Sequence, residues 1–265
     1  MTAADSKPDA NEIRLFLRNL DCDGFAVVPR IVDASDAAAL RAALEVAIET
    51  YPHREFGGGR DIGMVHALML WGRPFEKLLT NPRLRGFLSA ALGDTCVLYA
   101  YTSSSMPPRG RNYSARIHVD CPRFIPGYVT NVGVTLMLDD FTEQSGATYL
   151  LPGSQRLPDA PSEADFFSGA VRAIGRSGDA ILFNGRTWHR GGENRSDAWR
   201  HAATLNVCRA YMKQQFDWVR LVPPEIVDRN PPAFRHFLGY DVRVPTSLDE
   251  FYVPEESRLY KANQG

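Results

Sequence analysis

A series of short apolar runs from residue 95 onward most limits the folds open to this sequence. Each run is rich in β-branched or aromatic residues and is only a few residues long, which is typical of β-strands. Turn-forming clusters such as Pro152-Gly153-Ser154 and Ser177-Gly178-Asp179 separate the runs. Many short strands divided by turns predict a sandwich or barrel, and we interpret the pattern as a double-sheet jelly roll. The predicted strands cover residues 97–102, 114–119, 128–138, 148–151, 171–174, 180–183 and 201–211.

The first third of the chain has a different pattern, in which apolar residues recur at helical spacing. Asp33 or Ser35 can cap the second of the expected helices, because such side chains accept hydrogen bonds from free amides at a helix start. A short strand is predicted over residues 24–29, and the glycines within residues 57–61 predict a loop. The expected helices cover residues 13–20, residues 37–49 and, as one or two helices, residues 74–92.

Length and composition favour one domain that acts on a small molecule. A chain of 265 residues with 44% hydrophobic residues can bury a substantial core, so we expect a single domain over residues 1–265, with a flexible tail at 1–12 and the jelly-roll core at 95–211. The formal net charge of -1 gives no strong field toward nucleic acid or an anionic membrane. The first residues lack the pattern of a secretion signal, and the 4 cysteines lack CxxC spacing. We therefore expect a cytoplasmic protein with reduced thiols.

His118 and Asp120 stand two residues apart within a predicted strand. Side chains alternate across a strand, so both would project from one face together with Arg116, while Ile117 and Val119 pack on the other face. Imidazole and carboxylate groups are common metal ligands. The pattern by itself also fits a buried, hydrogen-bonded histidine, which is the more frequent case, so the interpretation depends on residues further along the chain.

His189 offers a third ligand, because a strand followed by a Gly-rich turn can return it to the side of His118 and Asp120. Two imidazoles and one carboxylate on one side of an ion leave about three positions open, as non-haem iron(II) oxygenases require for a co-substrate and dioxygen. This donor set favours iron(II) over zinc.

Arg200 stands at the start of the last long strand. Its planar guanidinium can bind a carboxylate through two parallel hydrogen bonds. If Arg200 faces the barrel interior, alternation places Thr204 and Asn206 on the same face, with room for a small dicarboxylate. The alternative is a surface arginine on a rim strand.

The order of these residues resembles the signature of the phytanoyl-CoA dioxygenase family, whose members are oxygenases dependent on iron(II) and 2-oxoglutarate. The resemblance implies a double-stranded β-helix core of the cupin-like kind, iron(II) ligation by His118, Asp120 and His189, and a salt bridge from Arg200 to the distal carboxylate of 2-oxoglutarate. It also implies a dioxygenase that uses O2, oxidises a C–H bond of a small organic molecule and releases succinate and CO2. The matching motifs are Asp23-Gly24-Phe25, His118-x-Asp120, Gly146 to Gly153-Ser154, Gly178-Asp179, His189, Arg200 and Leu238-Gly239-Tyr240.

Two positions depart from the family pattern. Gln155 stands where members often have histidine, and Gly191 stands where a hydroxyl residue often assists the arginine. In members that halogenate, a small residue replaces the carboxylate and frees a site for halide. Because Asp120 is present, the resemblance implies oxygenation, of which hydroxylation is the simplest form, and not chlorination.

The substrate residues are less constrained by the sequence. Arg116 would share the inward face with the metal ligands, and it lies among other arginines at 109, 111 and 123, so an anionic substrate is one interpretation; solvated loop arginines are the other. Phe124 and Trp188 flank the ligands and are candidates for an apolar wall, although core packing explains them equally well. A natural-product intermediate fits as well as a CoA thioester, and the oligomeric state is open.

Two other functions remain compatible with these residues. A zinc- or manganese-dependent cupin-like isomerase or hydrolase could also use a His2Asp site, but Arg200 would then have no co-substrate to bind. A non-catalytic jelly-roll binding module could keep the barrel without turnover, although the complete ligand set argues against it.

Overall fold

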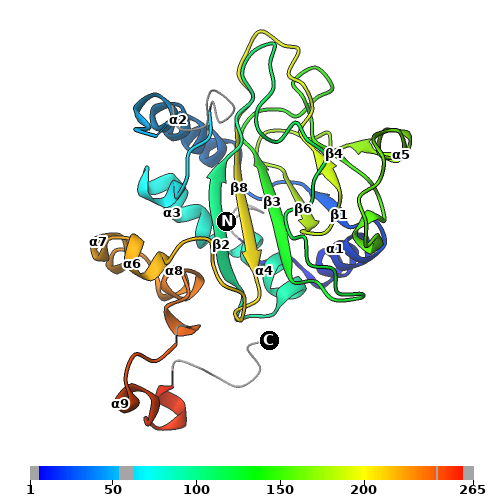
Figure 1. Ribbon diagram of the computed structural model, residues 1–265. Helices are drawn as coiled ribbons and strands as arrows, with labels where there is room; N and C mark the ends of the chain where they lie inside the picture. The colour runs from blue at the N-terminus through cyan, green and yellow to red at the C-terminus, as the bar shows by residue number, and fades with distance from the viewer. Residues whose placement is uncertain (1–5, 54–62, 243, 259–265) are drawn as a thin grey trace.

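The computed structural model describes residues 6–53, 63–242 and 244–258, and its centre consists of two antiparallel β-sheets (Figure 1). The five-stranded sheet has the order β1-β6-β3-β8-β2, which corresponds to Phe25–Val28, Ala180–Asn184, Asn131–Met137, Ala202–Cys208 and Val97–Ser103. The three-stranded sheet has the order β5-β4-β7, which corresponds to Val171–Arg172, Tyr149–Leu150 and His189–Arg190. Two such sheets with helices around them confirm the predicted jelly-roll core.

Six of the predicted strands are present, and the strand predicted over residues 114–119 is wrong. There the chain turns, because Asn112 O accepts from Ala115 N at 3.1 Å and Asn112 Oδ1 accepts from Ser114 N at 2.9 Å. These bonds occupy backbone amides that a strand would pair with a neighbour. Only His118 in this segment forms a bridge, with His189, which itself belongs to the unpredicted strand β7.

The helices α1 to α4 confirm the prediction for the first third of the chain. Asp33 caps α2 as expected, and residues 74–92 form two helices. The helix α1 begins before Ile13 because Asp9 and Glu12 form a reciprocal capping box, so the predicted tail at 1–12 is wrong for the residues from Ala10 onward. The loop predicted at residues 57–61 lies outside the described residues. The bounds are Ala10–Cys22 (α1), Ala34–Thr50 (α2), Arg73–Leu79 (α3) and Pro82–Leu92 (α4).

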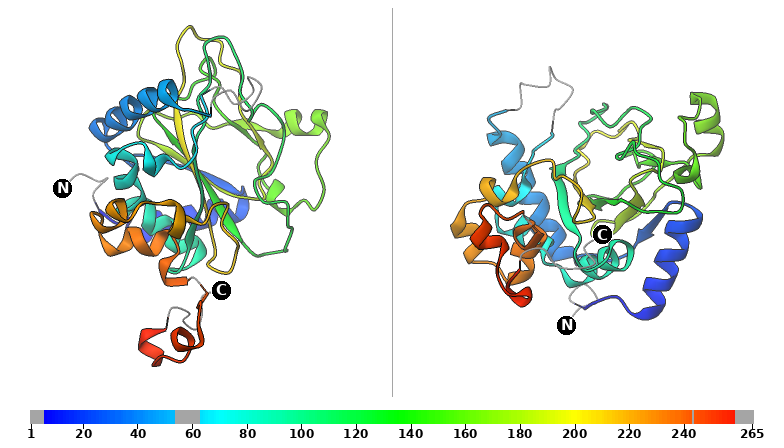
Figure 2. Two further views of the ribbon diagram at one scale, coloured as in Figure 1. Left: turned by 60° about the vertical axis from the view of Figure 1, so that its left-hand side comes forward. Right: turned by 60° about the horizontal axis from the view of Figure 1, so that its bottom comes forward.

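Short helices make up most of the last part of the chain, where the sequence has weak periodicity. They lie beside α3 and β2, except α9, which lies away from both sheets (Figures 1 and 2). In the part of the chain that the structure describes, no helix combines the length and apolar character needed to cross a membrane. Their bounds are Trp218–Leu221 (α6), Pro224–Asp228 (α7), Pro232–Phe237 (α8) and Leu248–Phe251 (α9), with 3-10 turns at Tyr240–Val242 and Glu255–Ser257. Earlier in the chain, α5 covers Glu163–Gly169, and 3-10 turns cover Leu68–Leu70 and Ser154–Arg156.

The two faces of the large sheet have different roles. On β3, Val132, Val134 and Leu136 belong to the core shared with helices α1 to α4. The alternate residues of the same strands face the smaller sheet, where Ile181 and Phe183 join Leu150 in a second apolar cluster. The space between the sheets is therefore reached only by every second residue of each strand, and the candidate site lies there. The single-domain organisation stays a prediction.

Candidate metal centre

His118 and His189 lie directly opposite each other in a short antiparallel pairing. His118 N donates to His189 O at 3.0 Å, and His189 N donates to His118 O at 2.9 Å. Residues that face each other across an antiparallel pair project their side chains to the same side. The two imidazole rings consequently lie with their centroids 4.2 Å apart, although the residues are far apart in the sequence.

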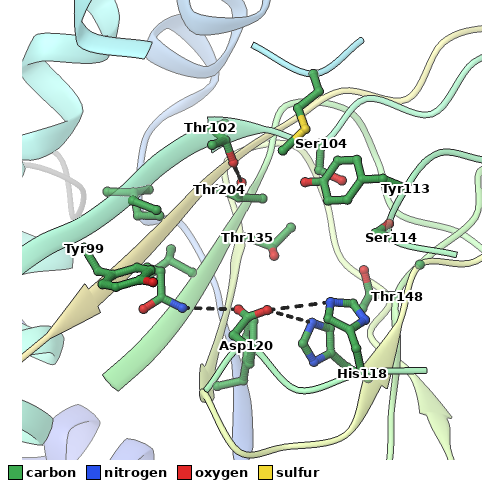
Figure 3. A pocket seen from close by; sticks show the side chains of 18 of the residues that line it. Tyr99, Thr102, Ser104, Tyr113, Ser114, His118, Asp120, Thr135, Thr148 and Thr204 are labelled. Carbon is green, nitrogen blue, oxygen red and sulfur yellow. Dashed lines mark hydrogen bonds and ion pairs between the residues drawn. The ribbon is translucent and has the colours of Figure 1, made fainter. Parts of the chain in front are cut away.

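The Asp120 carboxylate completes a cluster with the two histidines. Its Oδ1 lies 3.6 Å from His118 Nε2 and 3.6 Å from His189 Nε2. One donor atom from each of the three residues lies within 4.8 Å of the others, which is a spacing suited to a metal ion. The predicted triad is thus brought together, and Figure 3 shows the His118 and Asp120 side chains directed toward each other.

The outer nitrogens of both rings are held by backbone carbonyls. His118 Nδ1 donates to Arg116 O at 2.8 Å, and His189 Nδ1 donates to Thr187 O at 2.9 Å. Because a carbonyl oxygen only accepts, Nδ1 carries a proton in both rings, and Nε2 is the nitrogen of each ring that faces Asp120. Burial, reinforced by the neighbouring His189, lowers the pKa of His118 to about 4. The His118 ring is therefore neutral at neutral pH, as metal ligation requires.

A cavity of about 220 Å³ opens over this cluster. His118, Asp120 and His189 line it together with Arg200. Several hydroxyl side chains complete the lining, and Figure 3 shows most of them: Thr102, Ser104, Tyr113, Ser114, Thr135, Thr148 and Thr204.

Arg200 is a buried cation without an acidic partner among the described residues. Its side chain is 2% exposed and lies over the Phe141 ring, with Cζ 4.2 Å from the ring centroid. Its guanidinium donates only to two backbone carbonyls, Ser104 O at 3.2 Å and Gly146 O at 3.4 Å, and Nε has no partner. Burial lowers the pKa of Arg200 to about 10, so it is still charged at neutral pH. The cavity therefore pairs a cluster suited to a metal with a cation suited to an anion.

A model of the phytanoyl-CoA dioxygenase (PhyH) family matches residues 20–202, which is more than half of the chain. The chain belongs to the PhyH family.

The chain is also similar to proteins of bacteria and fungi and to solved structures. The uncharacterized protein Rv1501 of Mycobacterium tuberculosis is 29% identical over 255 residues, which cover 93% of each chain. The dioxygenase cdmD of Talaromyces verruculosus is 33% identical over 117 residues, which cover 43% of this chain and 37% of the fungal enzyme. The crystal structure of the epimerase SnoN in complex with Fe3+, alpha ketoglutarate and nogalamycin RO has a similar fold, with a TM-score of 0.66 and 20% identity over 81% of this chain and 91% of SnoN.

Three threonines of this PhyH-family protein form a row across the large sheet. Thr102 on β2 and Thr135 on β3 both face Thr204 on β8 in the strand register. The Thr102 and Thr204 hydroxyls lie 2.7 Å apart, and Thr204 Oγ1 also donates to Thr102 O at 3.1 Å. Sequence analysis identified only the facing of Thr204, because the facing of the other two depends on the register of their strands.

Tyr113 was also absent from the sequence-based candidates. It lies in the turn that replaces the predicted strand, and its hydroxyl donates to Ser103 O at 3.4 Å. Burial raises the pKa of Tyr113, so the phenol stays neutral. A tyrosine a few residues before the His-x-Asp pair is the only sequence signal that pointed to it.

The residues predicted to contact substrate lie elsewhere. Arg116 is exposed and is not part of the cavity lining. Phe124 lines a separate hollow, where the Arg186 guanidinium lies over its ring, and Trp188 is half-buried outside the cavity. Arg116 does not face the cavity because residues 112–115 form a turn. Without a strand, the alternation that would direct this side chain inward does not apply.

The two departures from the family pattern have different environments. Gln155 is outside the cavity, and its Nε2 donates to Asp21 O at 2.7 Å. Gly191 lines the cavity, and a Cβ at this position would lie 2.3 Å from Ser114 Oγ. The hydroxyl of Ser114 thus occupies the space that a side chain at position 191 would need.

Proposed function

We propose that this protein is an oxygenase dependent on iron(II) and 2-oxoglutarate that oxidises a C–H bond of a small organic molecule. His118, Asp120 and His189 would hold the iron, and Arg200 would bind the distal carboxylate of 2-oxoglutarate. One observation carries the proposal: the three donor atoms and a buried, unpaired guanidinium face the same cavity.

The donor set fits iron(II). Two imidazoles and one carboxylate on one side of the ion leave open positions for a keto acid and dioxygen. Arg200 fits the co-substrate, because burying a charge without a counter-ion is costly and a bidentate carboxylate would neutralise it. A zinc or manganese isomerase would leave this guanidinium unexplained.

With iron(II) and 2-oxoglutarate bound, dioxygen would be the oxidant: one of its oxygen atoms would end in succinate, formed with CO2 from the keto acid, and the other in the hydroxylated product. The residues of the chain have three tasks in this scheme. The triad binds the metal from one side, Arg200 fixes the orientation of the keto acid, and the threonine row supplies hydroxyls that can hydrogen-bond the substrate.

We propose hydroxylation as the outcome, and not chlorination, because Asp120 occupies the position that a halide would need. The similar fold of SnoN, which is an epimerase from nogalamycin biosynthesis, supports a natural-product intermediate as substrate and keeps other oxidative outcomes open. An anionic substrate has lost its support, since Arg109 and Arg111 pair with Asp197 and Glu193 and Arg116 is exposed.

The test is an anaerobic titration of metal-free protein with iron(II) and then 2-oxoglutarate. We expect the weak visible charge-transfer band of the iron–keto acid chelate, and its loss in His189→Ala. Admission of oxygen should then release succinate. Tight iron binding with no response to 2-oxoglutarate would instead support the cupin-like alternative, and chelate formation without any succinate would support a binding module.

A further inference from the structure

The two oxygens of the Asp120 carboxylate have different environments. Oδ1 faces both histidines, at 3.6 Å from each Nε2. Oδ2 is turned away from them and accepts a hydrogen bond from Asn206 Nδ2 at 3.3 Å. Figure 3 draws these three interactions as dashed lines that meet at Asp120.

Asn206 belongs to a chain of hydrogen bonds in which every donor points toward Asp120. Asn131 Nδ2 donates to Asn206 Oδ1 at 2.8 Å, and Thr130 Oγ1 donates to Asn131 Oδ1 at 3.0 Å. Each amide therefore receives a bond on its oxygen and gives one from its nitrogen. A flipped Asn206 would set its oxygen against the Asp120 carboxylate and its nitrogen against a donor, so this arrangement fixes the amide orientation.

The strand register places this chain of hydrogen bonds in the interior. Asn206 on β8 lies opposite Gly133 on β3, two residues from Asn131. The exposed fractions are 9% for Asn206, 3% for Asn131 and 5% for Thr130, so water does not compete freely for these bonds. Gly185 makes room for Asn131, since a Cβ there would lie 2.6 Å from the Asn131 amide atoms.

We infer that Asn206, oriented by Asn131, is a positioning residue that holds Oδ2 of Asp120 so that Oδ1 alone faces the metal. The inference rests on the proposed metal centre. A carboxylate that binds through one oxygen occupies one coordination position, whereas a freed carboxylate can rotate and occupy two. Asn206 thereby keeps the number of open positions that the proposed chemistry needs.

Cobalt(II) is the probe for this role, because its visible spectrum reports coordination number and its titration gives an affinity without turnover. We expect Asn206→Ala and the similarly sized Asn206→Leu to weaken cobalt(II) binding roughly 10- to 100-fold. Both variants should also change the intensity of the cobalt bands. Thermal unfolding of the metal-free proteins shows whether each variant is folded.

Two further variants separate positioning from packing. Asn131→Ala should weaken binding less than Asn206→Ala, and adding it to Asn206→Ala should cause little further loss, because Asn131 acts through Asn206. Val207→Ala, on the same strand but on its helix-facing side, should lower stability and leave cobalt affinity and spectrum unchanged.

His189→Ala decides what a negative result means. If it weakens cobalt(II) binding while both Asn206 variants keep the wild-type affinity and spectrum, the role of Asn206 is overturned and the metal centre stands. If none of these variants affects cobalt(II), the metal centre itself is overturned, and the role of Asn206 with it.

Discussion

At the scale of single residues, Arg200 is the most informative side chain of the cavity. Most buried arginines pair with a carboxylate, since desolvation of an unpaired charge is costly. Arg200 instead depends on two long bonds to carbonyls and on the Phe141 ring. These contacts stabilise the buried cation only in part, so a bound anion would stabilise it further.

Substitution of Arg200 should therefore affect the co-substrate and not the metal. We expect Arg200→Ala to weaken 2-oxoglutarate binding roughly 10- to 100-fold, which corresponds to a charge-assisted contact of about 1.5 to 3 kcal/mol. The 2-oxoglutarate affinity of Arg200→Lys should lie between those of the wild type and Arg200→Ala, because lysine keeps the charge but cannot donate two parallel hydrogen bonds. Anaerobic titration of the iron-loaded proteins gives the affinities. Arg186→Ala is the matched control, because Arg186 is equally buried but lines the other hollow; equal losses in both variants would contradict the assignment.

Gly133 is required by the packing behind the metal site. A Cβ at this position would lie 2.2 Å from Phe183 Cζ, and the Phe183 ring in turn packs against His189 with centroids 4.7 Å apart. Gly133→Ala should cost about 1 to 3 kcal/mol of unfolding free energy through overpacking. It should also weaken metal binding by displacing the ring from His189. Urea unfolding and metal titration measure the two effects.

A second-site change tests this explanation. Phe183→Leu should recover part of the stability lost in Gly133→Ala, since it removes the ring atoms that clash. Leu136→Ala, which alters the helix-facing side of the same strand, should lower stability and leave metal affinity unchanged. A Gly133→Ala variant with normal metal affinity would show that the ring does not position His189.

At the scale of secondary-structure elements, helix α3 is joined to the C-terminal helices by one buried carboxylate. Glu76 on α3 is fully buried, and it accepts hydrogen bonds from Arg73, from Arg229 and, at 2.6 Å, from Asn230. Arg229 and Asn230 lie between α7 and α8, so Glu76 connects segments far apart in the chain. An isolated glutamate in a short helix gave no sign of this role in the sequence.

The pKa of Glu76 gives the pH dependence of this connection. Burial by itself raises the pKa, but hydrogen bonds from Arg229, Asn230 and Arg73 outweigh it, so the net pKa lies below the usual 4.5. A carboxyl whose pKa is lowered by folding stabilises the protein above its unfolded pKa, and that contribution is lost as the pH falls through the folded value.

We expect Glu76→Gln to lower the free energy of unfolding at neutral pH by about 1 to 3 kcal/mol. The difference from wild type should shrink as the pH falls below the usual glutamate pKa, where the unfolded chain takes up a proton, and disappear below the lowered pKa of the folded protein. Urea unfolding over a pH series measures this. Glu163→Gln is the control, because the Glu163 side chain is 77% exposed; a difference that is independent of pH would refute the ionic role of Glu76.

At the scale of the whole molecule, the site is assembled from both sheets. Asn206, Thr204 and Thr135 come from the large sheet, His189 begins a strand of the small sheet, and Asp120 comes from the connecting chain. Ligands that join these parts should stabilise the entire fold, since they bind only when the sheets are packed together.

Anaerobic iron(II), followed by 2-oxoglutarate, should raise the unfolding free energy in two steps. Each step should reach about 2.7 kcal/mol when the free ligand is at 100 times its dissociation constant. Thermal unfolding at several ligand concentrations measures the increments. His189→Ala should lose the first step and Arg200→Ala only the second. If the two ligands stabilised His189→Ala as much as the wild type, a metal centre between the sheets would be contradicted.

The fold class and the chemical types of the site residues could be predicted from the amino-acid sequence. Strand length, turn residues and helical spacing are local properties, so the jelly-roll core and helices α1 to α4 could be read from the chain. His118, Asp120, His189 and Arg200 were identifiable because their chemistry and order are unusual together, whatever their exact placement. Their convergence in one cavity follows from the sheet pairing.

Which other residues face that cavity depends on how the strands pair in three dimensions. A shift of one residue in strand register reverses every side chain, so Thr102, Thr135 and the link from Asn131 to Asn206 depend on pairing that the sequence does not specify locally. A local turn, and not strand register, explains why Arg116 was placed inward and Tyr113 was missed. The Asn112 side chain accepts hydrogen bonds from Ser114, so the backbone before His118 forms a turn and not a strand.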